Sequence, residues 1–262
     1  MQLMSLADSF ARIPQRARTA RYGRKASLLL ALPLALMLAC GDDKEEPAGS
    51  DGGGAGSDAG GAEVDGGANT CSGKPGALRG KTTQTVTVGS APRSFVYYAP
   101  EGLDPNRAVP VVLVAHGFMM NAEMMYEITR YAALADAEKF VVLFIDGASA
   151  AGPWNVGMPD CQSSLGPLPL GTGDDQGFVD AALNLVEADR CIDREHVFMT
   201  GFSMGGYFSN ETGCLRDEIR AVAPHSGGTH DLSSCPSKKK PVLVMHFDGD
   251  ALIPHACGEK AR

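Results

Sequence analysis

The chain has 262 residues, 44% of them hydrophobic, which is enough apolar material for one sizeable core but not for two large ones. Its 31 acidic residues outnumber 23 Lys and Arg residues, and the formal net charge is -8. The globular part has no Lys or Arg stripe apart from Lys238 to Lys240, so it lacks the electrostatic footprint of a nucleic-acid binder, and we expect no nucleic-acid partner.

The first 40 residues are predicted to be a signal peptide. Six Lys and Arg residues between positions 12 and 25 precede an apolar run over 28–39, which is too short to span a bilayer. The run ends in Leu-Met-Leu-Ala before Cys40, and this ending resembles a bacterial lipobox, in which the cysteine takes the lipid. We therefore expect a lipid anchor on Cys40 as the one membrane contact, and a location at the cell envelope or outside the cell. An ordinary secretory signal with an incidental cysteine is the alternative.

Residues 41–70 are mainly Gly, Ala, Ser, Asp and Glu. Such a segment cannot bury enough apolar surface to offset the entropy lost on ordering, so we predict a disordered tether. The catalytic domain is expected over 71–262.

Cysteine usage after Cys40 indicates disulfides. The number of remaining cysteines is even, and an exported chain meets an oxidising environment. Among the many pairings, we expect Cys214 with Cys235 and Cys161 with Cys191. No C-x-x-C occurs and the spacings do not fit a zinc site, so no metal is expected.

The domain alternates β-rich runs with helical stretches, which is typical of an α/β fold with crossover helices. Residues 85–88 and 94–98 are predicted to form an antiparallel pair at the start of the sheet. Continuous apolar runs predict strands buried on both faces at 109–115, 140–145, 197–200 and 241–247. Helices are predicted over 122–138 and 175–190, the second with Asp174 as its N-cap.

The segment 201–205 carries the pattern G-x-S-x-G between a predicted strand and a predicted helix. In that context the serine lies on a strained turn, and the flanking glycines avoid clashes that a β-carbon would cause. The turn also aims the N-terminus of the helix at a developing oxyanion. We predict Ser203 as the nucleophile; a chance match at a tight turn is the alternative.

His116, Gly117 and Phe118 follow the strand 109–115, where a hydrolase of this kind supplies the second half of its oxyanion hole. We expect the backbone N–H groups of Phe118 and Met204 to be the donors. His116 is predicted to brace the loop rather than to act as the base. Trp154 either lines an acyl or aromatic pocket or packs in the interior.

Two carboxylates follow the run 241–247, where a triad acid would come after the serine in chain order. We predict Asp250 as this acid. Asp248 is the competing carboxylate, and its position beside Gly249 fits turn chemistry.

Together these blocks resemble the extracellular polyhydroxybutyrate depolymerase and feruloyl esterase family of α/β-hydrolases. The resemblance runs from about Cys71 to the C-terminus and rests on the order and spacing of 93–100, 116–117, 174–179, 191–193, 201–206, 221–227 and 250–254. It implies a mostly parallel sheet with helices on both faces and an exported Ser-His-Asp esterase that uses no metal or organic cofactor. On this resemblance Ser203 is the nucleophile and Asp250 the acid.

The chain departs from this family at the catalytic histidine, which the family places well beyond the acid, after one more strand. Only 12 residues follow Asp250, and His255 is the one histidine among them. We therefore expect a domain truncated before its last strand and helix, with the run 241–247 left as an exposed apolar edge. If the chain is complete, His255 is the candidate base, and His225 is a further alternative.

The sequence thus predicts a serine esterase acting on carboxylic esters of polymer or plant-wall type, such as a polyhydroxyalkanoate or a feruloyl or acetyl ester, through an acyl-enzyme on Ser203. The alternative is a catalytically impaired, hydrolase-like surface lipoprotein with a binding role.

Overall fold

The computed structural model describes residues 71–149, 152–156, 163–164, 166–167, 169–229, 235 and 239–259. All of them belong to the second of two compact units, Gly60–Arg262. The predicted signal peptide with Cys40 and the predicted tether lie outside the described residues. Within the described residues, no helix is long and apolar enough to cross a membrane.

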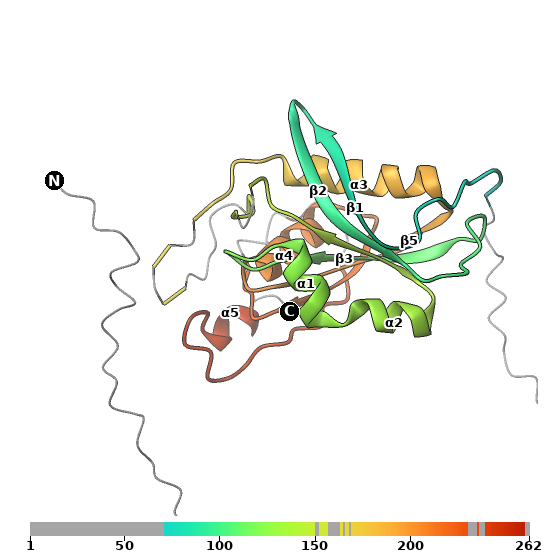
Figure 1. The fold of residues 1–262 in the computed structure, drawn as a ribbon. Helices are drawn as coiled ribbons and strands as arrows, with labels where there is room; N and C mark the ends of the chain where they lie inside the picture. Colours follow the sequence, from blue (N-terminus) through green and yellow to red (C-terminus); the bar gives the residue numbers. More distant parts are fainter. Residues whose placement is uncertain are drawn as a thin grey trace, which may run out of the picture. The chain divides into compact units, whose positions relative to one another are not determined.

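Six strands form one mixed sheet in the spatial order β1-β2-β4-β3-β5-β6 (Figure 1). Their bounds are Gly80–Val88 (β1), Ala91–Ala99 (β2), Val109–Ala115 (β3), Val141–Ile145 (β4), Ile192–Phe202 (β5) and Ile219–His225 (β6). β1 and β2 form the predicted antiparallel pair, β2 is antiparallel to β4, and β3 to β6 are parallel to one another. The carboxyl ends of four parallel strands therefore meet at one edge, where sheets of this class bind ligands.

Helices cover both faces of this sheet, as predicted. The helices are Ala122–Thr129 (α1), Tyr131–Glu138 (α2), Asp175–Asp189 (α3), Met204–Leu215 (α4) and His255–Glu259 (α5). In β3, Val111 and Leu113 pack with residues of α3 and α4, whereas Val112 and Val114 pack with residues of α1 and α2. In Figure 1, α1 and α2 lie on the opposite side of the sheet from α3. The alternation follows from the two-residue period of a strand and explains why the apolar runs are continuous.

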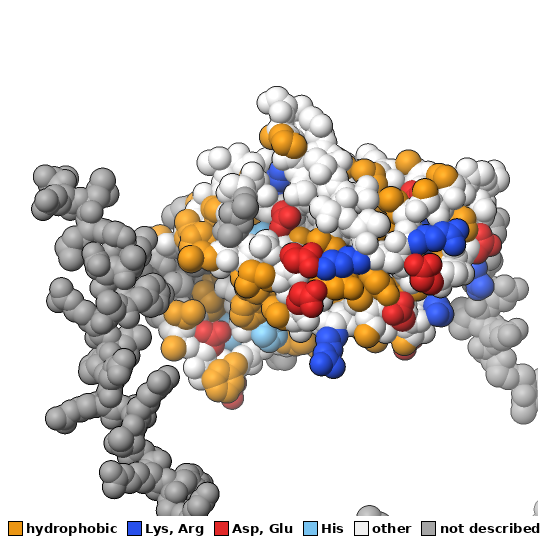
Figure 2. Space-filling view, viewed as in Figure 1, with side chains coloured by type: hydrophobic (Ala, Val, Ile, Leu, Met, Phe, Trp, Pro, Cys, Tyr) orange, Lys and Arg blue, Asp and Glu red, His pale blue; other side chains and the backbone are white. Residues whose placement is uncertain are grey.

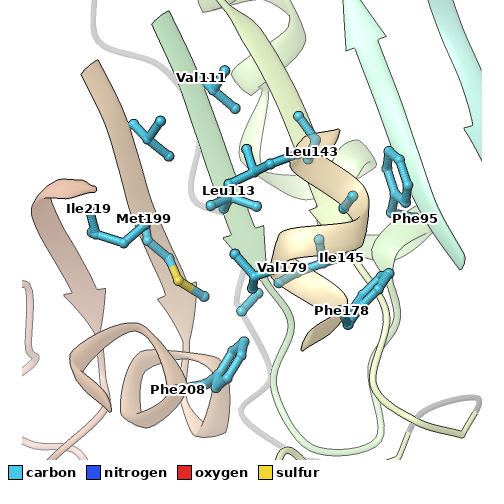
Figure 3. Packing of buried hydrophobic residues seen from close by; sticks show 14 of the residues in the cluster. Phe95, Val111, Leu113, Leu143, Ile145, Phe178, Val179, Met199, Phe208 and Ile219 are labelled. Carbon is cyan, nitrogen blue, oxygen red and sulfur yellow. The ribbon is translucent and has the colours of Figure 1, made fainter. Parts of the chain in front are cut away.

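The larger core lies between the sheet and α3 and α4. Figure 3 shows Phe178 and Val179 of α3 beside Leu113 and Ile145 of the sheet, all of them fully buried. Asp174 caps α3 as predicted, because its carboxylate accepts the N–H of Gly177 at 2.8 Å. This packing fixes the strands whose ends carry the candidate site.

The single helix predicted over 122–138 is wrong, because the chain forms two helices that meet at Arg130. Arg130 has a left-handed backbone with φ of 57°, which ends α1 and begins α2. Beside it, the Thr129 hydroxyl donates to the Met125 carbonyl at 2.7 Å and so competes with the helical ladder. The break lets Met125 and Ala135 both face the sheet.

The strand predicted over 241–247 is present only as two isolated parallel bridges to β6, at Val242 and at Met245. Leu243 N–H donates to Val222 O and Met245 N–H donates to Pro224 O, at 3.0 and 3.1 Å. Pro224 has no N–H to return to Leu243, so one rung of the ladder is missing there. The side chains of Leu243 and Phe247 are largely exposed, as expected of an uncovered apolar edge.

One predicted disulfide is confirmed and one is wrong. Cys214 pairs with Cys235, but Cys191 pairs with Cys71 and not with Cys161, which lies outside the described residues. Cys257 is disulfide-bonded as well. The Cys71–Cys191 bond joins the start of the domain to the start of β5, a contact between distant segments that spacing does not reveal.

Candidate active site

Ser203 lies in the predicted turn between β5 and α4. Its backbone has φ of 54° and ψ of -116°, a conformation that costs a non-glycine residue on the order of 1–3 kcal/mol. Hydrogen bonds hold the turn: Ser203 N–H donates to His225 O, and Ser203 O accepts the N–H of Gly206, both at 2.8 Å. The strain is therefore balanced by neighbouring elements, as is usual at functional sites.

The two glycines of the motif are required by close backbone contacts. A β-carbon at Gly201 would lie 2.2 Å from the carbonyl oxygen of Gly205, and one at Gly205 would lie 2.3 Å from that of Ala115. Backbone atoms cannot move aside cheaply, so only glycine fits at either place. As a result, the start of α4 lies directly against the ends of β3 and β5.

The two predicted oxyanion-hole donors lie on segments that meet at this turn. Met204 is the first residue of α4, so its N–H has no acceptor within the helix. Phe118 lies in the turn after β3, next to Gly117. A β-carbon at Gly117 would lie 3.1 Å from the ring of Phe202, which places this turn against the residue before Ser203.

His116 braces the loop, as predicted, and Trp154 belongs to the interior. Gly147 N–H donates to His116 Nε2 at 2.9 Å, so Nδ1 carries the proton and donates to Gly117 O at 2.8 Å. Burial lowers the pKa of His116 and keeps the ring neutral. Trp154 is fully buried, stacks on Phe208, and donates from Nε1 to His116 O at 2.8 Å. Packing is therefore the role that the structure gives Trp154, not the lining of a pocket.

Asp250 is the better held of the two candidate acids. Its Oδ1 accepts the N–H groups of Leu252 and Ile253, each at 2.9 Å. Partial burial acts to raise the pKa of Asp250, but these two N–H groups, the nearby His246 and the Ser226 hydroxyl outweigh it and lower the pKa. Asp250 is thus ionised near neutral pH, while the side chain of Asp248 is 93% exposed.

The histidines weighed as bases are held elsewhere. His255 Nε2 lies 3.5 Å from Asp248 Oδ1, and its ring meets that of His246 edge-on. His225 stacks its ring on Phe202 and offers its carbonyl to Ser203. Among the described residues, His255 thus pairs with the exposed Asp248 and not with Asp250.

Three residues around Asp250 are not singled out by the sequence. His246 Nε2 lies 3.6 Å from Asp250 Oδ2, and the Ser226 hydroxyl hydrogen-bonds the same carboxylate. Burial and the charge of Asp250 raise the pKa of Tyr207 to about 12. The only local signal for such a contact is the spacing of His246, which precedes Asp250 by four residues. That spacing alone does not predict a contact, because the contact depends on how the loop folds back.

The described residues contain no cluster of three His, Cys, Asp or Glu side chains that is placed to hold a metal ion. On the face shown in Figure 2, Lys and Arg side chains are interspersed with Asp and Glu side chains and with hydrophobic ones.

No family model matches the chain. Among its curated relatives are the following three, all of which carry esterase names. A feruloyl esterase B of Piromyces equi is 31% identical over 63% of this chain and 31% of its own length. A bifunctional acetylxylan esterase/xylanase of Neocallimastix patriciarum is 30% identical over 61% and 21%, and a feruloyl esterase C of Emericella nidulans is 30% identical over 62% and 56%. The chain thus spans between about a fifth and about half of the length of these relatives.

Two solved structures share the fold. An acetyl xylan esterase from Aspergillus awamori superimposes with a TM-score of 0.52 at 15% identity, covering 69% of this chain and 77% of that one. A thermostable esterase gives a TM-score of 0.51 at 19% identity, covering 69% and 50%. The chain therefore has the α/β-hydrolase fold, and its sequence relatives are proteins named feruloyl and acetylxylan esterase.

Proposed function

We propose that this protein is a serine esterase that hydrolyses a carboxylic ester through an acyl-enzyme on Ser203. The observation that carries the proposal is the strained turn at Ser203, which leaves no room for a β-carbon at Gly201 or Gly205. Sequence similarity to proteins named feruloyl and acetylxylan esterase supports the same reaction class.

In this proposal, the Ser203 hydroxyl loses its proton to a histidine base and Oγ attacks the ester carbonyl. The backbone N–H groups of Phe118 and Met204 bind the oxyanion of the tetrahedral intermediate. Collapse of that intermediate breaks the bond to the alcohol, which leaves with the proton from the base. Water then attacks the acyl-enzyme by the same route and releases the acid and free Ser203.

Asp250 is the proposed acid, which orients the base and stabilises its charged form. Support comes from its lowered pKa and from the two backbone N–H groups that fix Oδ1 while Oδ2 stays close to His246. We assign no base among the described residues. For His255 to serve, its ring would have to leave Asp248, and His255→Ala would then abolish turnover.

We further propose a feruloyl or acetyl ester as substrate, the classes named by the relatives. A lipid anchor on Cys40 and a place at the cell envelope or outside the cell remain part of the proposal. Disulfides at Cys71–Cys191 and Cys214–Cys235 support an oxidising compartment.

The test is hydrolysis of p-nitrophenyl acetate and methyl ferulate by the purified chain. Ser203→Ala should abolish turnover, and Asp250→Asn should lower kcat by about 10⁴-fold, because asparagine holds the imidazole in the wrong tautomer. Asp248→Asn is the matched control and should keep the wild-type rate. Equal, background-level rates in wild type and Ser203→Ala would refute the esterase and favour the binding role on the same scaffold.

A further inference from the structure

We infer that His246 is a positioning residue that holds Asp250 in place. The inference rests on the proposed function, since it gives His246 a role in the same site through Asp250. It concerns the loop 248–253, in which Asp250 lies.

His246 follows the bridge at Met245, at the point where the chain leaves the edge of the sheet. Its side chain is 1% exposed, although the residues on either side are exposed. Nε2 lies 2.8 Å from the carbonyl oxygen of Ile253. A carbonyl only accepts hydrogen bonds, so Nε2 carries the proton and donates it.

Ile253 joins His246 to Asp250. Its carbonyl accepts from His246, and its N–H donates to Asp250 Oδ1 at 2.9 Å. The same Nε2 lies 3.6 Å from Asp250 Oδ2, so the N–H side of the imidazole, which carries partial positive charge, faces the carboxylate. The loop is thus closed by two side chains that hydrogen-bond the two backbone polar groups of one residue, Ile253, and loss of the imidazole would leave its buried carbonyl without a donor.

The other side of the ring leaves it no room to shift. Nδ1 is buried and has no hydrogen-bond partner among the described residues, which fits an unprotonated nitrogen. A β-carbon at Gly258 of α5 would lie 2.5 Å from this nitrogen. The ring is therefore wedged between α5 and the loop, with its donor aimed at Ile253.

Substitutions of His246 can distinguish a ring that only fills space from a ring whose N–H donates a needed hydrogen bond. Glutamine can place its amide N–H near the position of Nε2, whereas leucine fills much of the volume with no donor. The experiment therefore compares His246→Gln and His246→Leu with wild type. It adds Gly258→Ala, which displaces the imidazole of His246 without changing its chemistry. His196→Leu is the control, because His196 is half exposed and pairs with Asp193.

Two measurements are made on each full-length variant: kcat and KM for p-nitrophenyl acetate, and hydrogen exchange of the Leu252 and Ile253 amides. We expect His246→Leu and Gly258→Ala to lower kcat by about 10²-fold with little change in KM, and to expose both amides, because a displaced acid misaligns the base. His246→Gln should retain most of the rate and the amide protection, and His196→Leu should match wild type.

Unchanged kcat and unchanged amide protection in His246→Leu would overturn the inference. Equal losses in the Gln and Leu variants would also overturn it, since the ring would then matter for packing alone. If wild type has no esterase activity, the proposed function fails, and amide exchange still decides the positioning role. In that case, protection lost in His246→Leu but kept in His246→Gln supports it, and protection kept in both refutes it.

Discussion

Glu211 on α4 is a carboxylic acid held where its charge is poorly solvated. Burial, and next the charge of Asp175, raise its pKa to about 7. Its Oε2 is buried without a hydrogen-bond partner among the described residues, and the adjacent Asp175 is itself engaged by Arg93 at 2.6 Å. The protonated form of Glu211 is therefore the one that the folded state prefers.

Because the folded pKa of Glu211 lies above the unfolded value, its contribution to stability is complete below about pH 4.5 and is lost as the pH rises through about 7. We expect the unfolding free energy of wild type to fall between pH 5 and pH 8 by about 1–2 kcal/mol more than that of Glu211→Gln, a figure that allows for partial exposure to solvent. Urea denaturation at both pH values measures this difference. Glu195→Gln, at an exposed position, should follow wild type, and parallel pH profiles for wild type and Glu211→Gln would disprove the expectation.

At the scale of elements, the disulfides differ in how much chain they close. Cys71–Cys191 spans 120 residues and ties the segment before β1 to the start of β5, whereas Cys214–Cys235 spans 21 residues and begins in the last turn of α4. In the chain-entropy model, the longer loop constrains the unfolded state more.

Replacing Cys71 and Cys191 together by alanine should therefore lower the unfolding free energy by about 1.5 kcal/mol more than replacing Cys214 and Cys235. Urea denaturation of the two double variants gives the comparison directly. A larger loss from the Cys214–Cys235 pair would show that native packing around that bond, rather than loop closure, sets the stability.

The strands and α3 are predictable from sequence because the information for them is local. A continuous apolar run such as 109–115 marks a strand covered on both faces, and Asp174 marks the start of α3. The break at Arg130 is not predictable in this way, because no glycine or proline lies near it. The break depends on how Met125 and Ala135 pack against the sheet. The interrupted edge at 241–247 depends on Pro224 in a neighbouring strand.

At the scale of the whole molecule, the candidate site likewise has one part that a local sequence pattern predicts and another that only the tertiary structure brings together. G-x-S-x-G is a local pattern, so the turn at Ser203 is predictable together with the need for Gly201 and Gly205. The surroundings of Asp250 come from segments far apart in sequence, with Ser226 after β6 and Tyr207 on α4. The role of His246 emerges only when the loop folds back so that Ile253 meets the ring. The local pattern thus identifies the candidate nucleophile, and the tertiary structure identifies what surrounds the candidate acid.

Covalent labelling by a fluorophosphonate probe is the most direct measurement of whether Ser203 is an activated nucleophile. We predict one adduct on the native protein, located at Ser203 by peptide mass spectrometry and lost in Ser203→Ala or after unfolding. Failure of the native chain to label at Ser203, or equal labelling of wild type and Ser203→Ala, would contradict it.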